Sequence, residues 1–456
     1  MRTEQDLIEA LRNAASGAPA PVDLDRLLAV RRRRRTRRRY QSALAAAGVV
    51  AVALGGTAVV RGGDRTDEVR PMASAVPSAA DPSPADRPTL PKERARPARE
   101  VWPEAVSTFP KKAADGFKYR PVTALSPTEI LLTAEASFEK AGRLEVYDTR
   151  TGEARVLATM TPGGKGYYVQ NVEPGRDYIA WYGTTPNDDR KWADFWVVPR
   201  QGGEPIRVGE VTGDLALVDR IGVTGDHIVW SPKSGGVYRM PISGGPPEKV
   251  AGTDGLWLAS WPWARDVLGD AGPDEEQRNR NQTLLVDLET GARRSITAPS
   301  GVTGLRCATE WCVGNSDGSD GNVFAMRPDG TEGKQLPGRA YMPEIHGGHF
   351  VQLRERHHAL YDLNTGKVAG VSAITKDGAG GSYGRGVSSS PTLVFYWNAG
   401  EIKAKRTCVP MREEDRKTMA SAGATPSPGA TTCMTEFIDL GDKYDVLNLA
   451  AVPDAG

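Results

Sequence analysis

Cysteine is the residue type in this chain whose spacing points most directly to covalent chemistry. Its four cysteines are Cys307, Cys312, Cys408 and Cys433. The segment RCATEWCV places Cys307 and Cys312 across a tight turn, where opposed positions of antiparallel strands bring Cβ atoms within disulfide range. We predict this bridge, and a second one between Cys408 and Cys433 around a long polar insertion. An even set of paired cysteines favours an oxidising compartment.

Residues that could hold a metal ion do not form a recognisable site in the sequence. There is no CxxC motif, and no histidine lies at ligand spacing from a cysteine. His346 and His349 in EIHGGHF, with His357 and His358 in RERHHAL, are interpreted as turn and strand-edge residues. The acidic stretch GNSDGSDGN at 314–322 lacks the spacing of an EF-hand calcium loop and is interpreted as a polar connection. We therefore expect neither a metal nor a cofactor.

Catalytic motifs are missing as well. The chain contains no GxSxG, HExxH, phosphate-binding or dinucleotide-binding signature. A carboxylate pair for glycoside hydrolysis would have to be assembled from distant loops, and no pair stands out. We expect a protein that is not an enzyme, with an exported hydrolase acting on glycans or peptides as the alternative.

The elements that would position these residues form a repeat. Short apolar segments follow turn signals at intervals of roughly 40 to 50 residues. They are EILLTAE at 129, DYIAWYG at 177, DHIVWSP at 226, a weaker RDVLGDAG at 265, EWCVGNS at 310, HFVQLRE at 349 and TLVFYWN at 392. Each precedes a strand–turn–strand pattern, such as DTRTGEAR or, in the last copy, FIDLGDKYDVLNL, in which glycine supplies a positive φ.

A unit of four antiparallel strands cannot bury both of its faces alone, whereas seven such units packed around an axis bury them against each other. We predict an all-β fold, a seven-bladed β-propeller over residues 101–456, with six or eight blades as alternatives. The hairpins DTRTGEAR, DLETGARR and DLNTGKVA resemble turns of the TolB-like, quinoprotein-like and WD-type propeller superfamilies over roughly residues 115–453. No WD dipeptide closes the hairpins, and Ala369 and Gly370 stand where a quinoprotein repeat has tryptophan, so the resemblance implies the fold and no quinone cofactor.

The connections between the second and third strands of several repeats are long and polar. In a propeller they emerge on the same face as the connections between blades, and by analogy we expect that face to bind a ligand or a protein. Its charged residues are Asp188, Asp189, Arg190, Asp274, Glu275, Glu276, Asp317, Asp320, Arg356 and His357. We expect Trp257, Trp261 and Trp263 near it, either as packing between blades or as a ligand platform.

Residues 41–60 are predicted to be a transmembrane helix. The nineteen residues from Ser42 to Val60 are uncharged, and a helix of that length spans roughly 28 Å. Eight arginines within 31–39 precede it, which predicts a cytoplasmic N-terminus and an extracytoplasmic propeller at the cell membrane. A cleavable signal peptide, a twin-arginine export signal read from TRRRYQ, and a nucleic-acid-binding arm are the alternatives.

Charge is unevenly distributed along the chain. Residues 1–40 hold eleven arginines against five acidic residues, a net charge of +6, whereas the whole chain carries +1. A basic tail on a mildly acidic body argues against nucleic acid as the partner. We predict that residues 1–40 form a cytoplasmic helical tail, which lies on the membrane, docks on a cytosolic partner or serves only as a topology signal. Residues 61–100 are rich in proline and alanine and are predicted to be a disordered linker.

This layout resembles actinobacterial-type single-pass membrane proteins that combine a basic tail, one anchor helix, a Pro/Ala-rich stalk and an extracytoplasmic propeller. Some of these are associated with extracytoplasmic-function sigma factors. The resemblance implies an anti-sigma-like sensor or regulator, in which residues 1–30 bind a sigma factor and the propeller binds an unknown ligand or protein. A structural module of the cell envelope is a further alternative.

Overall fold

The computed structural model describes most of the chain from residue 95 to residue 453. The described ranges are 95–137, 140–160, 166–185, 191–269, 274–316, 322–337, 344–354, 358–372, 383–400, 402–411, 431–439 and 441–453. The predicted tail (1–40), the predicted anchor (41–60) and nearly all of the predicted linker (61–100) lie outside them. Within these ranges, no helix has both the length and the hydropathy needed to cross a bilayer.

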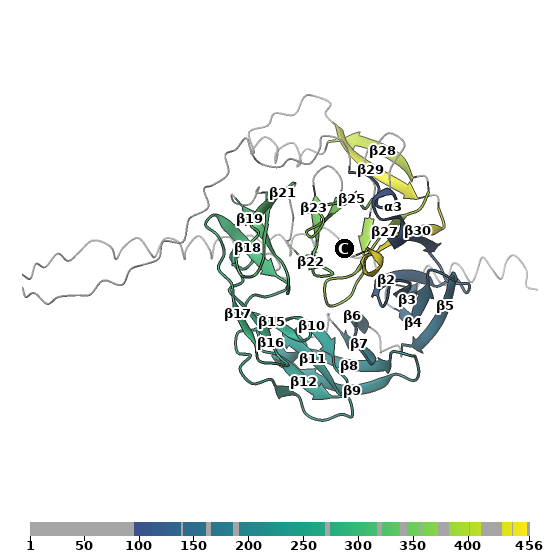
Figure 1. Ribbon diagram of the computed structural model, residues 1–456. Coiled ribbons are helices and arrows are strands. Elements are labelled where there is room, and N and C mark those ends of the chain that lie inside the picture. Colours follow the sequence, from purple (N-terminus) through teal and green to yellow (C-terminus); the bar gives the residue numbers. More distant parts are fainter. Residues whose placement is uncertain are drawn as a thin grey trace, which may run out of the picture. The chain divides into compact units, whose positions relative to one another are not determined.

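Seven antiparallel sheets of four strands, each called a blade, are arranged in a ring within the described residues (Figure 1). Blade one contains β2 (Lys118–Ala124), β3 (Glu129–Ser137), β4 (Lys140–Asp148) and β5 (Glu153–Thr159), and blade two contains β6 (Tyr168–Pro174), β7 (Tyr178–Thr184), β8 (Trp192–Pro199) and β9 (Ile206–Thr212). Blade three contains β10 (Val218–Val223), β11 (His227–Pro232), β12 (Tyr238–Pro241) and β13 (Glu248–Lys249). Blade four contains β14 (Trp257–Ser260), β15 (Trp263–Arg265), β16 (Leu284–Asp287) and β17 (Arg293–Ser295).

Blade five contains β18 (Val302–Cys307), β19 (Cys312–Ser316), β20 (Val323–Met326) and β21 (Lys334–Leu336), and blade six contains β22 (Ile345–His346), β23 (Phe350–Arg354), β24 (His358–Asp362) and β25 (Val368–Gly370). Short helical segments are α3 (Ala98–Val101), η2 (Pro103–Ala105), η3 (Gly213–Ala216), α4 (Glu275–Asn279) and η4 (Leu449–Ala451). The predicted seven-bladed propeller is therefore confirmed. All seven apolar repeat segments overlap second strands, although the weak copy at 265 does so only through the last residue of β15.

Blade seven is closed by strands from both ends of the described chain. Its strand order is β1 (Val106–Pro110), β30 (Lys443–Asn448), β27 (Val394–Asn398) and β26 (Tyr383–Arg385). β1 pairs antiparallel with β30 from Val106 opposite Leu447 to Pro110 opposite Lys443. Pairing the first strand with the last leaves the ring no open edge.

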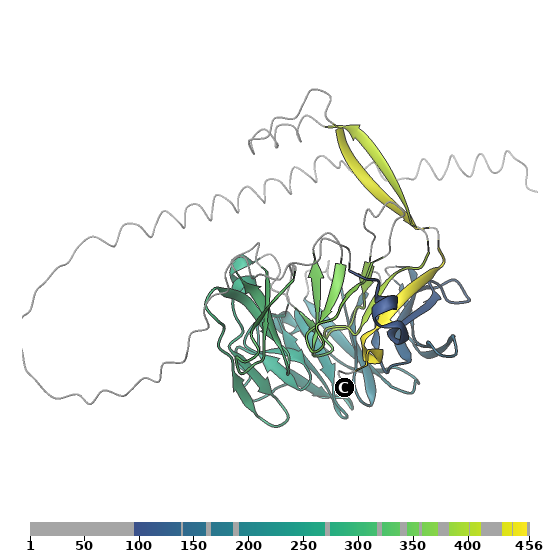
Figure 2. The same cartoon turned by 45° about the horizontal axis from the view of Figure 1, so that its top comes forward.

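This closure corrects one sequence prediction. FIDLGDKYDVLNL at 437 does not form the third and fourth strands of blade seven, because its second half is β30 and its first half belongs to β29 (Thr431–Asp439). β29 pairs instead with β28 (Ile402–Pro410) in a separate two-stranded hairpin, which projects from the ring (Figure 2). The hairpin is inserted between β27 and β30.

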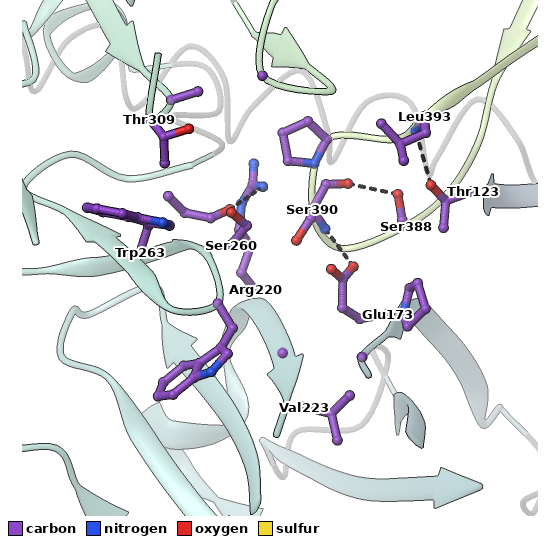
Figure 3. Close-up of a pocket in the computed structure, with 18 of the residues that line it drawn as sticks. Thr123, Glu173, Arg220, Val223, Ser260, Trp263, Thr309, Ser388, Ser390 and Leu393 are labelled. Carbon is purple, nitrogen blue, oxygen red and sulfur yellow. Dashed lines mark hydrogen bonds between the residues drawn. The ribbon is translucent and has the colours of Figure 1, made fainter. Parts of the chain in front are cut away.

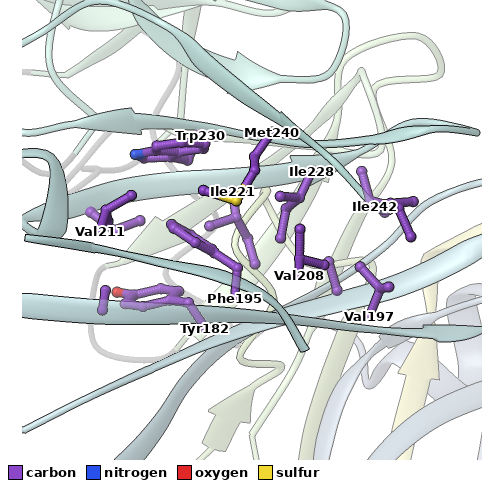
Figure 4. Packing of buried hydrophobic residues seen from close by; sticks show 14 of the residues in the cluster. Tyr182, Phe195, Val197, Val208, Val211, Ile221, Ile228, Trp230, Met240 and Ile242 are labelled. Atoms are coloured by element: carbon purple, nitrogen blue, oxygen red, sulfur yellow. The ribbon is translucent and has the colours of Figure 1, made fainter. Parts of the chain in front are cut away.

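The core of the molecule lies between the blades. Seven clusters of buried apolar residues fill the interfaces of the described blades, one for each neighbouring pair. Between blades two and three, the fully buried Phe195 and Trp230 have ring centroids 4.7 Å apart and pack with Met240 (Figure 4). Burying a side chain of this size contributes roughly 2–3 kcal/mol, so blade packing, as predicted, stabilises the ring.

The outer hairpins contain the turns that the sequence pattern predicts. In blade one, Asp148 Oδ1 accepts hydrogen bonds from the amides of Arg150 at 2.8 Å and Thr151 at 3.3 Å. Asp287 and Asp362 accept equivalent bonds in blades four and six. The glycine that follows has a positive φ of 78° at Gly152, which favours glycine because it lacks a Cβ.

The segment before β1 fastens blade six to blade seven. The amide of Gly370, the last residue of β25, donates to Arg96 O at 2.8 Å. Trp102 is 3% exposed and its ring meets Phe350 of blade six edge-on, with centroids 5.7 Å apart. The folded part of the described chain thus includes residues within the range predicted as a linker.

Candidate functional site: the axial cavity

A cavity of about 810 Å³ lies at the axis of the ring. The turns between first and second strands line it in every blade: Ala124 and Leu125, Pro174 to Asp177, Val223 to Gly225, Ser260 and Trp261, Ala308 and Thr309, Gly347 and Gly348, and Ser390 and Pro391. In an antiparallel blade these turns lie at the strand ends opposite to the connections between second and third strands. The cavity therefore opens on the face opposite to the one the sequence predicts for binding.

Most of the predicted binding-face residues cannot be compared with the cavity. Asp188, Asp189, Arg190, Asp317, Asp320, Arg356 and His357 lie outside the described residues. Asp274 caps helix α4 by accepting from the amides of Glu276 and Gln277. Asp274, Glu275 and Glu276 are exposed and do not line the cavity.

Three buried arginines from blades three, four and five line the cavity. Arg220 on β10 is 8% exposed, Arg265 on β15 is 8% exposed and Arg306 on β18 is 9% exposed. The pairing register shifts next to Arg220 in blade three and next to Arg306 in blade five. Such bulges re-aim side chains and are common beside functional sites.

Two of these arginines are held by hydrogen bonds. Arg220 (Figure 3) donates to Ala259 O at 2.8 Å and to Glu344 Oε1 at 3.2 Å. Arg306 donates to Arg280 O at 2.7 Å and Gln277 O at 3.2 Å, both in the connection that carries α4. Burial lowers the pKa of Arg306 to about 10, so its guanidinium remains protonated at neutral pH.

Arg265 differs from its two neighbours because it makes no hydrogen bond or ion pair with any residue that the structure describes, and its Nε is buried without a partner. Burial, followed by the charges of Arg220 and Arg306, lowers the pKa of Arg265 to about 9. Asp219 and Glu344 act in the opposite direction. The guanidinium is therefore still protonated at neutral pH.

Gly269 lies directly beside Arg220 and Arg265. A Cβ at this glycine would stand 3.1 Å from Asp219 Oδ2, 3.2 Å from Arg220 Nε and 3.3 Å from Arg265 Nη2. A Cβ here would require these side chains to shift by a few tenths of an ångström, so the start of the connection between β15 and β16 lies directly beside the two guanidinium groups. Asp219 and Gly269 themselves do not line the cavity.

Two of the acidic residues in the lining have shifted pKa values. Glu173 on β6 accepts a hydrogen bond from the Ser390 amide at 2.8 Å (Figure 3), and burial raises its pKa to about 7. Burial also acts on Glu344, but the charges of His346, Arg220 and Arg385 prevail and lower its pKa to about 2. At neutral pH, Glu344 is ionised and Glu173 is partly protonated.

The turn of blade seven crosses toward the inner strands of other blades. Ser389 Oγ accepts a hydrogen bond from the Ile221 amide of blade three at 2.8 Å, and the Ser389 amide donates to Val172 O of blade two at 3.2 Å. Ser388 Oγ donates to Ser390 O at 2.8 Å within the turn (Figure 3). This turn therefore ties one wall of the cavity to the inner strands.

Two of the three tryptophans singled out by the sequence reach the cavity. Half-buried Trp261 donates from Nε1 to Glu289 Oε1 at 2.9 Å, and half-buried Trp263 has the Arg294 guanidinium 5.2 Å from its ring centroid. They lie on the face opposite to the one predicted, because residues 260–263 form the first turn of blade four. Trp257 is outside the lining and donates to Lys233 O at 3.3 Å.

The predicted bridge between Cys307 and Cys312 is confirmed, and the described part of the second bridge agrees with its prediction. Cys307 and Cys312 form a disulfide across the first turn of blade five, with Cα atoms 3.9 Å apart, and Cys307 lines the cavity. Cys408 is disulfide-bonded, and Cys433 is its opposite residue in the β28–β29 register. No cysteine among the described residues is free.

Histidine does not build a metal centre in the described ranges, where no group of three His, Cys, Asp or Glu side chains converges. His346 is 1% exposed, its Nδ1 lies 2.9 Å from Thr392 O, and burial lowers its pKa. His349 follows in the turn and His358 begins β24, which agrees with turn and strand-edge positions. His357 is outside the description.

The sequence reasoning missed the charged residues of the cavity lining, among them Glu173, Arg220, Arg265, Arg306 and Glu344. A signal was present for two of them. Arg220 in VDRIGV and Arg306 in VTGLRC interrupt apolar strands, and a charged residue inside a buried strand is uncommon unless it is paired or functional. Arg265 and Glu344 stand at strand ends, where a charge carries no such information.

Comparisons with known proteins extend to the fold only. No family model matches the chain, and no curated protein matches it. Similar solved structures include YCF48 bound to D1 peptide, 10% identical over 68% of this chain and 95% of that chain with a TM-score of 0.41. Puromycin hydrolase is 13% identical over 58% of this chain and 51% of that chain with a TM-score of 0.37, and BamB from Moraxella catarrhalis is 10% identical over 55% and 72% with a TM-score of 0.28.

Proposed function

We propose that this protein is a membrane-anchored, extracytoplasmic β-propeller that binds a small ligand in its axial cavity. The volume of about 810 Å³ falls within the range usual for small-molecule sites. The observation that carries the proposal is the group of three buried arginines around one cavity. Burying charge costs folding free energy, and a ring needed only as a scaffold could fill its axis with apolar side chains.

A cavity-filling substitution tests this function. Ser260 lines the cavity, whereas Ser295 is exposed on the outer strand of the same blade. The full chain in detergent is screened for thermal stabilisation by sugars, amino acids, organic acids and nucleotides, and hits are measured by calorimetry. We expect at least one compound to bind the wild type and the Ser295→Trp control, and to lose binding to Ser260→Trp. A ligand that binds all three equally would exclude the cavity.

The predicted location is also part of the proposal. It is supported by the uncharged segment 42–60 behind the arginine cluster and by the disulfide between Cys307 and Cys312, which persists in oxidising compartments. Protease added to intact cells is expected to digest the propeller and spare the N-terminal tail. A propeller that is protected until the cells are lysed contradicts this topology.

We further propose that residues 1–30 bind a cytosolic regulator such as a sigma factor. The apolar residues Leu7 and Leu11 share one face of the predicted first helix, whereas Gln5 does not. Full chain purified from its own cells is expected to bring down the regulator, the double substitution of Leu7 and Leu11 by Asp to lose it, and Gln5→Asp to keep it. Full chain that recovers no cytosolic partner counts against the signalling role.

A hydrolase is the second candidate, and two of the cavity acids favour it. Glu173 and Glu344 line one cavity with pKa values of about 7 and about 2, a split that suits a general acid and an ionised carboxylate. Wild-type turnover on a glycan and peptide panel is expected to fall at least about 100-fold in Glu173→Gln, while Glu210→Gln on exposed β9 keeps it. If the wild-type protein shows no turnover, the hydrolase is excluded. If it also binds no compound in the screen, a structural module of the cell envelope remains.

A further inference from the structure

Arg265 is a buried charge that the described protein does not pair. Its side chain lines the axial cavity, it is 8% exposed, and it makes no hydrogen bond or ion pair with any described residue. Buried charges in proteins are normally paired or bind ions, since an isolated one is strongly destabilising. The cavity side of Arg265 therefore lacks an anion.

The acidic residues of the cavity do not supply that anion, because none of them, including the exposed Asp177 in the first turn of blade two, forms an ion pair with Arg265 in the described structure. Glu344 forms ion pairs with Arg220 at 3.2 Å and Arg385 at 3.1 Å, and Glu173 accepts from the Ser390 amide. Glu289 accepts from the Trp261 indole at 2.9 Å. Asp219 is near enough to favour the charged form of Arg265, but it stands behind the wall with Gly269 rather than in the lining.

We infer that Arg265 binds the carboxylate or phosphate group of a small organic anion in the axial cavity, with Arg220 and Arg306 completing a positive wall. The inference rests on the proposed function and names the class of its ligand. A guanidinium presents a planar fork of donors that matches both oxyanions in a bidentate way. Because Arg220 and Arg306 are already held by protein acceptors, they add charge while Arg265 keeps its donors available.

The remaining lining indicates what the rest of the ligand contains. The cavity volume of about 810 Å³ far exceeds that of a bare phosphate ion. Trp261 and Trp263 are half-buried in the same lining, and tryptophan rings offer flat apolar faces with a polar edge. We therefore expect the anionic group to be attached to a ring or chain that contacts these tryptophans.

Matched pairs of compounds test the inference on the full chain. Calorimetry compares glucuronate and glucose 6-phosphate with glucose, and benzoate with benzyl alcohol, with citrate and inorganic phosphate as separate probes. We expect at least one anion to bind more than tenfold tighter than its neutral counterpart. The carboxylate and phosphate arms show which oxyanion is preferred.

Substitution of the arginine gives the second half of the test. Arg265→Met is expected to weaken binding of that anion by about 10- to 100-fold, and Arg265→Lys to weaken it by less, since charge is kept and the fork is lost. Arg293→Met removes an exposed arginine from the outer strand of the same blade and should leave affinity unchanged. Thermal unfolding of each variant confirms that it is folded.

The outcomes separate this inference from the proposed function. A ligand that binds in the cavity, as judged by Ser260→Trp, yet is neutral or unaffected by Arg265→Met overturns the inference and leaves the binding function standing. Anions that bind weakly, equally and independently of Arg265 also overturn it. A chain that binds no compound in either screen contradicts the binding function itself.

Discussion

The two sides of the axial cavity are built from the same kind of blade but satisfy their polar groups differently. On the side of blades one, two and seven, Thr123 Oγ1 accepts from the Leu393 amide at 3.0 Å, and Glu173 and Ser388 are likewise bonded within the wall. On the side of blades three to five, Arg265 has no such partner among the described residues. The buried carboxylate of the first side is bonded within the wall, although Ser390 Oγ there is buried without a partner, whereas the charged group of Arg265 on the second side is unpaired in the described structure.

The largest difference in stability should appear between two arginines on the side of blades three to five, which we call the basic side. Arg220→Met leaves Ala259 O and one oxygen of Glu344 without their donor, and breaking a buried pair in this way should lower the free energy of unfolding by about 3 kcal/mol. Arg265→Met removes an unpaired charge and should change that free energy by less than about 1 kcal/mol. Urea unfolding of the full chain measures both, and equal losses would remove the distinction between the paired and the unpaired arginine.

The disulfide of the basic side should have the next largest effect. Replacing Cys307 and Cys312 by Ala opens a short loop, which should cost about 2 kcal/mol of unfolding free energy. Replacing Cys408 and Cys433 by Ala should leave the unfolding midpoint of the ring unchanged, because β28 and β29 form a sheet separate from the blades. Thermal unfolding followed by tryptophan fluorescence distinguishes the two, and a similar shift from both pairs would contradict this assignment.

On the opposite side, Glu173 predicts a pH dependence. Its pKa is raised from 4.5 to about 7 in the folded protein, chiefly by burial, so ionisation is disfavoured in the folded state. As pH rises from about 4.5 to about 7, the wild type should lose about 1–2 kcal/mol of unfolding free energy relative to Glu173→Gln, after allowance for the partial exposure of the group. Urea unfolding at pH 4.5 and pH 8 measures this difference, and parallel stability profiles would show that Glu173 ionises freely.

The smallest effect is expected in the turn of blade seven. Ser389→Ala removes the acceptor of the Ile221 amide, a buried contact between blades seven and three, and should cost about 1 kcal/mol. Ser388→Ala removes a bond within the turn and should cost less than about 0.5 kcal/mol. If chemical denaturation shows a larger loss of stability for Ser388→Ala than for Ser389→Ala, the contact between Ser389 and Ile221 does not stabilise the cavity wall.

The ring could be predicted because its signals are local. Apolar second strands such as DYIAWYG lie within a single blade and recur from blade to blade. The same is true of Asp–x–x–Thr–Gly turns such as the one from Asp148 to Gly152. Cys307 and Cys312 are likewise local, because they face each other across one turn. Periodicity identifies such features without knowledge of long-range pairing.

The cavity and the closure could not be predicted in this way. β1 is a short strand whose partner β30 lies more than three hundred residues later, and nothing local specifies that pairing. Arg220, Arg265, Arg306 and Glu344 meet only because the ring brings their blades together. Arg265 was further obscured because the weak repeat segment starts on it, which hides its position at the end of a strand.

The closure of blade seven has a mechanical consequence. Any tension applied to the chain from its N-terminal side meets the bond between Arg96 and Gly370, then the buried Trp102, and then β1, which is held to β30 through five paired residues. The seam would carry the load before any of the other six blades, and its rupture would expose the edge of β30 while leaving their sheets intact. Such a pull would open the ring at one defined place.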